Sequence, residues 1–318
     1  MTAAVDLEKE YHPVSFTLDD YDRMKELFSA SFGIALSHNQ FLKRYDTSAL
    51  GSELIGFIAI HRETGTPAAY YGVFPLKISW KGRIMLSAQS GDTMTHPLHR
   101  KKGLFIWLAK MTYEKCAEKG MQLVFGLPNE NSYPGFINRL GWKEIDRVIR
   151  YDIKLSIKTI PLPKWSHKLK AFNSYSQLAK KILGNKKISV VNEMINPQPS
   201  AMAKVWRDKA YLDYKNEADK IFIEIDGILL WIKLSDVLWI GELSDYQAVD
   251  DQLIRKLKRL AFFLGYNTIS FHLNAGTPSP GFLRYFKKYN EVPSCFLDLS
   301  GNNSDFNILL TAADFDTW

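Results

Sequence analysis

The sequence predicts an α/β (α+β) protein of two domains, each a mixed, mostly antiparallel sheet flanked by helices. Three observations support this prediction. At 318 residues the chain is long enough for two domains. In its first half, segments of strand character alternate with segments whose apolar residues recur at helical spacing. In its second half, part of the same order of elements returns, which indicates a structural duplication.

The first elements expected are one strand and two helices. Residues 13–18 have the composition of a strand. Asp19 or Asp20 is then suited to cap a helix that Gly33 ends, because carboxylates accept hydrogen bonds from free N–H groups and glycine adopts the left-handed conformation. A second, short helix is expected at 37–46.

Three strands are expected next, joined by turns. Residues 53–60 and 67–80 have strand character and are separated by a segment in which Gly65 supplies turn chemistry. Residues 80–83 predict a hairpin turn into a further strand at 84–95.

The first half is expected to end with two helices and two strands. Apolar residues on one face predict a helix from 104 that Gly120 ends, followed by a short buried strand at 121–128. A helix is expected to begin near Ser132 and to stop at Gly141. An alternating strand over 143–155 completes the set.

The second half repeats the later part of this order. We expect a three-stranded meander at 222–244, a helix from Asp250 or Asp251 to Gly265 and a strand at 267–274, and then a helix at 279–289 and a strand at 294–300. The tripeptide Pro-Gly-Phe occurs in both halves, at 134–136 and 280–282. The expected divisions are a first domain at 1–155, a linker at 156–215 and a second domain at 216–318.

The composition is that of a soluble globular protein, with 46% hydrophobic and 24% charged residues. Cys116 and Cys295 lie far apart without ligand-like spacing, so we expect two core thiols, no disulfide and no metal site. The acidic N-terminus does not resemble a secretory signal, and no apolar run has the length of a membrane helix. A cytoplasmic location is therefore expected.

The positive charge is concentrated in the linker. The net charge of +7 divides into +3 for residues 1–150, +9 for 151–215 and −5 for 216–318, so no general DNA-binding surface is indicated. Residues 164–187 predict an amphipathic helix with a lysine-rich face. It could pack on one or both domains, which we favour, lie on an anionic membrane surface, or attract an anionic substrate.

The segment Thr95–Phe105, THPLHRKKGLF, joins a predicted strand to a predicted helix. The start of a helix presents free N–H groups and the positive end of the helix dipole, which together suit a pyrophosphate. Gly103 permits close approach of the backbone, and Arg100, Lys101 and Lys102 add positive charge. The segment therefore predicts phosphate binding, although a solvated basic turn remains the alternative.

The segment lacks the spacing of a Walker loop or of a dinucleotide fingerprint. Its proline, arginine and glycine, which follow a long strand, instead resemble the acyl-CoA-binding motif of the GNAT superfamily of N-acyltransferases. The expected order of elements also resembles that family over residues 12–155. Residues 220–300 resemble a second, degenerate copy, in which acidic residues take the place of the basic turn.

The resemblance implies an acyl-CoA site. Thr95 would lie beside the acetyl carbonyl and polarise it through its main chain. In that family the two strands on either side of this connection splay apart so that pantetheine enters between them, and Asn129 or Asn131 would contact it, unless these residues only cap a helix. The residues expected at the cofactor are Met94, Thr95, Arg100, Lys101, Lys102, Gly103, Leu104, Phe105, Asn129 and Asn131.

The catalytic groups are less clearly indicated. The position where many family members carry an acidic tyrosine is Ile137 here, and Tyr133 could replace it or serve as an aromatic staple. An amine acceptor needs a general base or a water relay. Asp92 is the first candidate for that base and Glu130 the second, while a capping or bulge role is the alternative for Asp92.

The resemblance implies an N-acyltransferase that moves an acetyl group from acetyl-CoA to an amine by direct attack. A small molecule or an amino sugar is the expected acceptor. The alternatives are a Fem-like transferase that uses aminoacyl-tRNA and a non-catalytic CoA-binding protein. The second copy is not expected to bind CoA.

Overall fold

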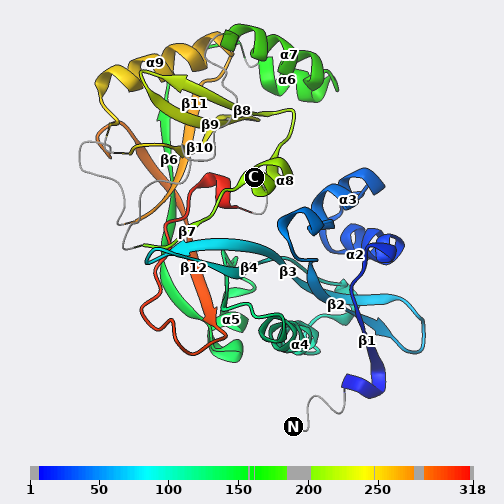
Figure 1. Cartoon of the computed structure of the whole chain (residues 1–318). Helices are drawn as coiled ribbons and strands as arrows, with labels where there is room; N and C mark the ends of the chain where they lie inside the picture. Colours follow the sequence, from blue (N-terminus) through cyan, green and yellow to red (C-terminus); the bar gives the residue numbers. More distant parts are fainter. Residues whose placement is uncertain are drawn as a thin grey trace. The chain divides into compact units, whose positions relative to one another are not determined.

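The computed structural model describes residues 7–156, 158–160, 162–184, 202–246, 248–275 and 283–315 (Figure 1). The chain forms two compact units. The first consists of Met1–Ile78, Arg83–Ile145 and Ser294–Phe306, and the second of Ser79–Gly82, Asp146–Pro293 and Asn307–Trp318. Each unit therefore combines segments that are distant in sequence. The expected domains, at 1–155 and 216–318 with a linker at 156–215, stay a prediction.

The first unit contains a mixed sheet in the order β1-β2-β3-β4-β5-β12. Its strands are β1 (Tyr11–Ser15), β2 (Ile55–His61), β3 (Pro67–Trp80), β4 (Arg83–Thr95), β5 (Leu123–Gly126) and the end of β12 (Lys287–Asp298). The pairs β1–β2, β2–β3 and β5–β12 are antiparallel, whereas β4 and β5 are parallel. A parallel pair needs a crossover connection, and α4 (Leu104–Glu118) supplies it.

Four helices flank this sheet, in the order that the sequence predicted. They are α2 (Tyr21–Phe32), α3 (His38–Tyr45), α4 and α5 (Tyr133–Leu140). Gly33 and Gly141 adopt the left-handed conformation at the ends of α2 and α5, as expected. Ser37 and Gln40 form a reciprocal capping box at the start of α3.

The helices cover both faces of the sheet (Figure 1). Met24 and Leu27 of α2 and Phe41 of α3 pack on one face together with Tyr70 of β3. On the other face, Tyr71 of β3 packs against residues of α4 and α5. Because successive side chains of a strand point to opposite faces, β3 is buried on both sides, which explains its continuous apolar run.

The second unit contains a sheet in the order β6-β11-β10-β9-β8. Its elements are β6 (Lys143–Lys154), α6 (Leu162–Lys168), α7 (Phe172–Leu183), β7 (Lys204–Val205), α8 (Lys209–Lys215), β8 (Lys220–Ile225), β9 (Ile228–Leu234), β10 (Leu238–Leu243), α9 (Asp251–Phe263) and β11 (Thr268–Asn274). The strands β10 and β11 are parallel and the other pairs antiparallel. Helices α7 and α9 pack on one face.

The last strand of each half of the chain completes the sheet of the other unit. The end of β12 pairs with β5, from Cys295 opposite Gly126 to Asp298 opposite Leu123. Most of β6 pairs with β11 in the second unit, between 148 and 154. Both units therefore consist of an antiparallel meander, a helix and a parallel strand, followed by a strand taken from the other half.

Two elements differ from the sequence-based expectation. The basic segment forms two helices, α6 and α7, because Lys170 adopts a positive φ of 55° and ends the helical path between them. The predicted helix at 279–289 is wrong in its last part, since β12 already begins at Lys287. Residues 276–282 lie outside the described residues, and with them the second Pro-Gly-Phe.

Both cysteines lie in cores, as predicted, and are free thiols. Burial raises the pKa of Cys116 to about 12, so its thiol is protonated and unreactive at neutral pH. Among the residues that the structure describes, no helix has both the length and the apolar character needed to cross a membrane.

His272 predicts acid sensitivity of the second unit. Its ring lies 4.4 Å from that of Phe315 and 4.8 Å from that of Trp239, measured between centroids. Burial, and secondarily the charge of Arg150, lowers the pKa of His272 to about 4. The unfolded chain takes up this proton first, so between about pH 6.5 and 4 falling pH should lower the free energy of unfolding by up to about 3 kcal/mol.

Urea denaturation across this pH range measures the effect. In His272→Phe, which keeps an aromatic ring between its neighbours, this part of the acid destabilisation should disappear. An identical pH dependence in both proteins would show that His272 is not responsible.

Candidate active site

The connection from β4 to α4 forms a turn with free backbone donors. The N–H of His96 donates to the carbonyl of Ala68 at 2.8 Å, which holds the end of β4 against β3. Pro97–His99 then form a single 3-10 turn, and Gly103 takes the N-cap position of α4. Because a helix provides no acceptors for its first N–H groups, those of the turn that begins at Leu104 remain available to a ligand.

Gly103 leaves this turn open. Its φ is +88°, a conformation that side chains other than glycine rarely adopt, and a Cβ placed on it would meet no atom within 4 Å. Arg100 and Lys101 beside it are exposed. Lys102 forms an ion pair with Glu10, and the Arg100 Nε donates to the carbonyl of Thr95 at 3.4 Å. The turn combines free N–H groups, space and positive charge, which suits a pyrophosphate.

Three of the expected cofactor residues have side chains that pack against the protein. Met94 and Leu104 are each 1% exposed and lie in the cores on opposite faces of the sheet. Phe105 packs against Phe136 of α5, with 5.0 Å between ring centroids. The buried Met94 and Leu104 could therefore contact a ligand only through their main chains.

Strand β4 separates from β5 beside this turn. The two strands pair at Ala88–Val124 and Gln89–Phe125, and β5 ends at Gly126, whereas β4 continues to Thr95. Ser90 lies beside Gly126, the last residue of β5, and beyond Ser90 the edge of β4 no longer faces β5, so its backbone groups can accept an extended ligand there.

Asp92 marks a bulge in β4. Its backbone has a positive φ of 51°. At this bulge the regular alternation of side chains between the two faces of the sheet is interrupted. Ala88 and Ser90 face the side of α4, where Ser90 contacts Tyr71. Asp92 and Met94 are also at even-numbered positions of β4, but their side chains face α2 and α3. The bulge therefore places Ser90 and Asp92 on opposite faces of the sheet.

The carboxylate of Asp92 is bound on its own face. Arg44 of α3 forms a bidentate ion pair with it, with 2.7 Å from Nη2 to Oδ1, and the Tyr45 hydroxyl donates to Oδ2 at 2.9 Å. These three donors hold both carboxylate oxygens by hydrogen bonds. The contacts fit the bulge role that was the alternative to catalysis, and the role as a base stays a prediction.

The remaining predicted residues lie at the start of α5. The Asn129 Oδ1 accepts from the N–H groups of Asn131 and Ser132, at 3.0 and 3.1 Å, which fits the capping alternative. Asn131 and Glu130 are exposed. The Tyr133 hydroxyl donates to the carboxylate of Glu144 on β6. Contacts of these residues with a ligand stay predictions.

A buried chain of hydroxyl groups was missed by the sequence analysis. The Trp142 Nε1 donates to the Tyr113 hydroxyl at 3.0 Å. The Tyr113 and Tyr71 hydroxyl oxygens are 2.8 Å apart, and the Tyr71 oxygen is 2.9 Å from the Ser90 Oγ. Trp142 directly precedes β6, and the other three residues lie on α4, β3 and β4. No spacing or motif connects them, so only the fold brings them together.

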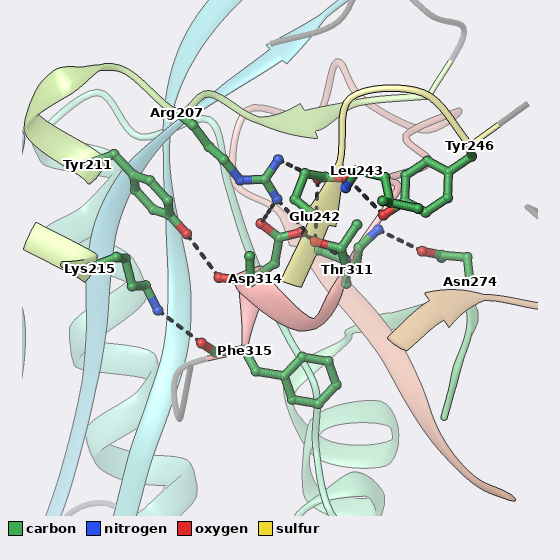
Figure 2. Close-up of polar contacts among 12 residues, drawn as sticks. Arg207, Tyr211, Lys215, Glu242, Leu243, Tyr246, Asn274, Thr311, Asp314 and Phe315 are labelled. Atoms are coloured by element: carbon green, nitrogen blue, oxygen red, sulfur yellow. Dashed lines mark hydrogen bonds and ion pairs between the residues drawn. The ribbon is translucent and has the colours of Figure 1, made fainter. Parts of the chain in front are cut away.

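The second unit has a buried ion-pair cluster after its parallel strand pair (Figure 2). Arg207 is 2% exposed and lies 2.6 Å from a carboxylate oxygen of both Glu242 and Asp314. Glu242 follows an irregularity in β10, and the Tyr246 hydroxyl also donates to it. The start of α9 is capped by the Asp250 carboxylate, which accepts from the N–H of Leu253. Carboxylates thus stand where the first unit has free donors and cations.

The segment before Asp314 also lies along β11. The N–H of Leu310 donates to the Asn274 side chain at 2.6 Å, and Thr311 forms a bridge with Leu273. The end of β11 is therefore occupied by the chain itself.

The first unit thus joins a parallel strand pair, which parts at its end, to a helix that begins at Gly103 beside exposed cations. Residues 13–145 match the family described as Acetyltransferase (GNAT) domain. Residues 13–145 are therefore a GNAT acetyltransferase domain.

Solved structures with the same fold extend over most of the chain. A GCN5-related N-acetyltransferase from Kribbella flavida aligns with a TM-score of 0.60 and 13% identity, over 92% of this chain and 72% of that one. A conserved protein of unknown function from Enterococcus faecalis V583 has a TM-score of 0.59 at 14% identity, with coverages of 91% and 73%. A GCN5-related N-acetyltransferase from Anabaena variabilis ATCC 29413 has 0.56 at 9%, with coverages of 91% and 73%. No curated protein matches significantly.

The contacts of Asp92 predict the effect of its removal. Asp92→Asn replaces a charged acceptor of three hydrogen bonds, so the free energy of unfolding should fall by about 2 kcal/mol while acetyl-CoA still binds. Chemical denaturation and ligand titration measure the two effects, and Glu130→Gln, at an exposed position, is the control. An Asp92→Asn protein of unchanged stability that has lost the acidic limb of its pH–rate profile, where the rate rises as the base loses its proton, would instead identify Asp92 as the base.

Proposed function

We propose that the first unit transfers an acetyl group from acetyl-CoA to an amine. The observation that carries this proposal is the open turn at Gly103, which lies directly after a bulged β4 that parts from β5. A pyrophosphate fits the turn, because free N–H groups, Arg100 and Lys101 converge there without a side chain at residue 103. An extended pantetheine arm fits the free edge of β4.

In this proposal the main chain of β4 and of the turn holds the cofactor. The phosphates are bound by Lys101, by Lys102 and by the first turn of α4. To do so, Lys102 leaves its ion pair with Glu10 and pairs with a phosphate instead. The backbone around Thr95 donates to the acetyl carbonyl and stabilises the oxyanion that forms there. Acetyl-CoA supplies an activated acyl group and a thiolate leaving group. The amine attacks the carbonyl carbon directly, so no acyl-enzyme is required.

We further propose that the second unit is a degenerate copy of the first. Its order of meander, helix and parallel strand is the same, and the exchange of last strands joins equivalent positions. Its counterpart of the CoA site contains Glu242 and Asp250, which repel a pyrophosphate. A small molecule or amino sugar remains the acceptor class that we propose, and an aminoacyl-tRNA-dependent or non-catalytic protein is the alternative.

Thermal unfolding with acetyl-CoA tests the cofactor. A ligand present at about 100 times its dissociation constant stabilises a protein by roughly 2.7 kcal/mol, so the midpoint should rise by several degrees. In Gly103→Trp the indole would occupy the turn, and the rise should disappear.

Gly120 provides a matched control. It has a similar positive φ of 77°, is equally open and lies at the other end of α4, so Gly120→Trp introduces comparable strain without blocking the turn. Equal ligand responses of the two variants would place the pyrophosphate elsewhere. Thiol release from acetyl-CoA with a panel of amines then separates a transferase from a CoA-binding protein without catalysis.

The α6–α7 surface has a separate proposed role. Tyr175, Ala179 and Leu183 pack into the core of the second unit, which agrees with the favoured interpretation of a packed helix. On the outside, however, Trp165 is 55% and Leu169 76% exposed. The same two helices and the turn between them carry Lys164, Lys168, Lys170, Lys180 and Lys181, of which all but the half-buried Lys180 are exposed. We propose that this surface binds an anionic membrane, since it combines exposed apolar groups with cations.

Co-sedimentation with vesicles tests this role. Binding should require phosphatidylserine, weaken with salt and fall several-fold in Trp165→Ala. Leu42→Ala, in which an exposed apolar residue of α3 is removed, is the control. Absence of binding to phosphatidylserine vesicles at low salt would exclude the proposed role.

A further inference from the structure

The hydroxyl chain Trp142–Tyr113–Tyr71–Ser90 runs through the core of the first unit to the point where β4 and β5 part. Tyr71 is fully buried and Tyr113 is 7% exposed, whereas Ser90 is half-buried. The chain therefore connects an enclosed indole with a hydroxyl that borders the proposed pantetheine site.

Hydrogen-bond chemistry gives the chain a direction. An indole N–H can only donate, so Trp142 uses one lone pair of the Tyr113 oxygen. The Tyr113 proton then needs an acceptor in a buried environment, and Tyr71 provides the oxygen within reach, at 2.8 Å. Tyr71 in turn donates to the Ser90 Oγ at 2.9 Å. The opposite direction would leave the Tyr113 proton buried and unsatisfied, which is costly.

Both phenols are fixed as neutral donors. Burial raises the pKa of Tyr71 and that of Tyr113 well above the usual value for tyrosine. Neither phenol releases its proton at physiological pH, so the direction of the chain is maintained.

The proton of Ser90 is consequently directed outward. The Oγ accepts from Tyr71, and within the described part of the chain Ser90 has no other hydrogen-bond partner. The neighbouring residue across the gap is Gly126, where a Cβ would lie 3.4 Å from the Ser90 Cβ. The same Cβ would lie 3.4 Å from the Trp142 ring, so the glycine leaves room for about one ligand atom between this ring and Ser90.

We propose that Ser90 is a catalytic residue that donates a hydrogen bond to the sulfur of CoA as the thiolate departs, and that Tyr71 and Tyr113 position it. In the transfer step the amine nitrogen bonds to the acyl carbon, the carbon–sulfur bond breaks and its electron pair remains on sulfur. The Ser90 hydroxyl stabilises this charge and keeps its proton. The proton lost by the amine passes to solvent water. This inference rests on the proposed function, and it supplies the leaving-group assistance for which no tyrosine is available at Ile137.

Titration of the thiol of bound CoA tests the proposal without a known acceptor. Ultraviolet absorbance of the thiolate should give a lower pKa for CoA bound to the wild-type protein than for free CoA. In Ser90→Ala the pKa of the bound thiol should rise by about one unit, because a hydrogen bond to the charged sulfur is lost. Tyr71→Phe should give an intermediate value.

Ser87→Ala is the matched control. Ser87 is a fully buried serine on the same strand, and its Oγ has no hydrogen-bond partner among the described residues. Its removal should leave the thiol titration unchanged. With an accepted amine, Ser90→Ala should also lower kcat about tenfold with little change in the KM for acetyl-CoA.

The possible failures are distinguishable. If CoA binds equally well to the wild type and to Ser90→Ala, and its thiol titrates at the same pH in both, the role of Ser90 is wrong while the proposed function stands. If the wild-type protein does not bind CoA and shows no thermal shift with it, the proposed function fails and the role of Ser90 fails with it.

Discussion

The ion pair between Arg44 and Asp92 supports the geometry on which the candidate site depends. Asp92 has a left-handed backbone that costs free energy in a residue other than glycine, and its three hydrogen bonds offset this cost. The bulge that results reverses the faces of β4. In a regular strand every second side chain points to the same face. Without the bulge, the side chains of residues 92 and 94 would therefore point to the same face as Ser90. A contact on one face of the sheet thus determines which groups border the gap on the other.

The two units differ in the groups that lie beside their parallel strands where these strands separate. In the first unit the space beside β4 is bordered by a small glycine and by a serine hydroxyl. In the second unit the space is occupied by the Arg207 cluster and by the segment from Leu310 to Asp314 (Figure 2). A buried ion pair of this kind contributes little net stability compared with apolar packing, but the loss of one partner is expensive. Loss of any one of these charged groups would therefore be expected to destabilise the second unit.

Local signals were the part of the fold that the sequence could predict. Gly33, Gly141 and the Ser37 box act within one turn of the chain, and the order of elements in the first half follows from such signals and from periodicity. The basic turn at Gly103 was found because its residues are adjacent. The break at Lys170 was missed because lysine, unlike glycine, does not indicate a positive φ in a sequence. The hydroxyl chain joins residues 71, 90, 113 and 142, and neither it nor the strand exchange has a local signature.

The exchange of last strands has a consequence for synthesis of the protein. Strand β5 (Leu123–Gly126) is translated long before its antiparallel neighbour, which begins to pair with it at Cys295. Until the ribosome has synthesised residues 295–298, this edge of β5 has no permanent partner, and unpaired edges are prone to join other chains. The large sequence separation also predicts slow completion of the sheet. The first unit is thus complete only after β12 has been synthesised, and nascent chains depend on protection of the β5 edge until that strand emerges.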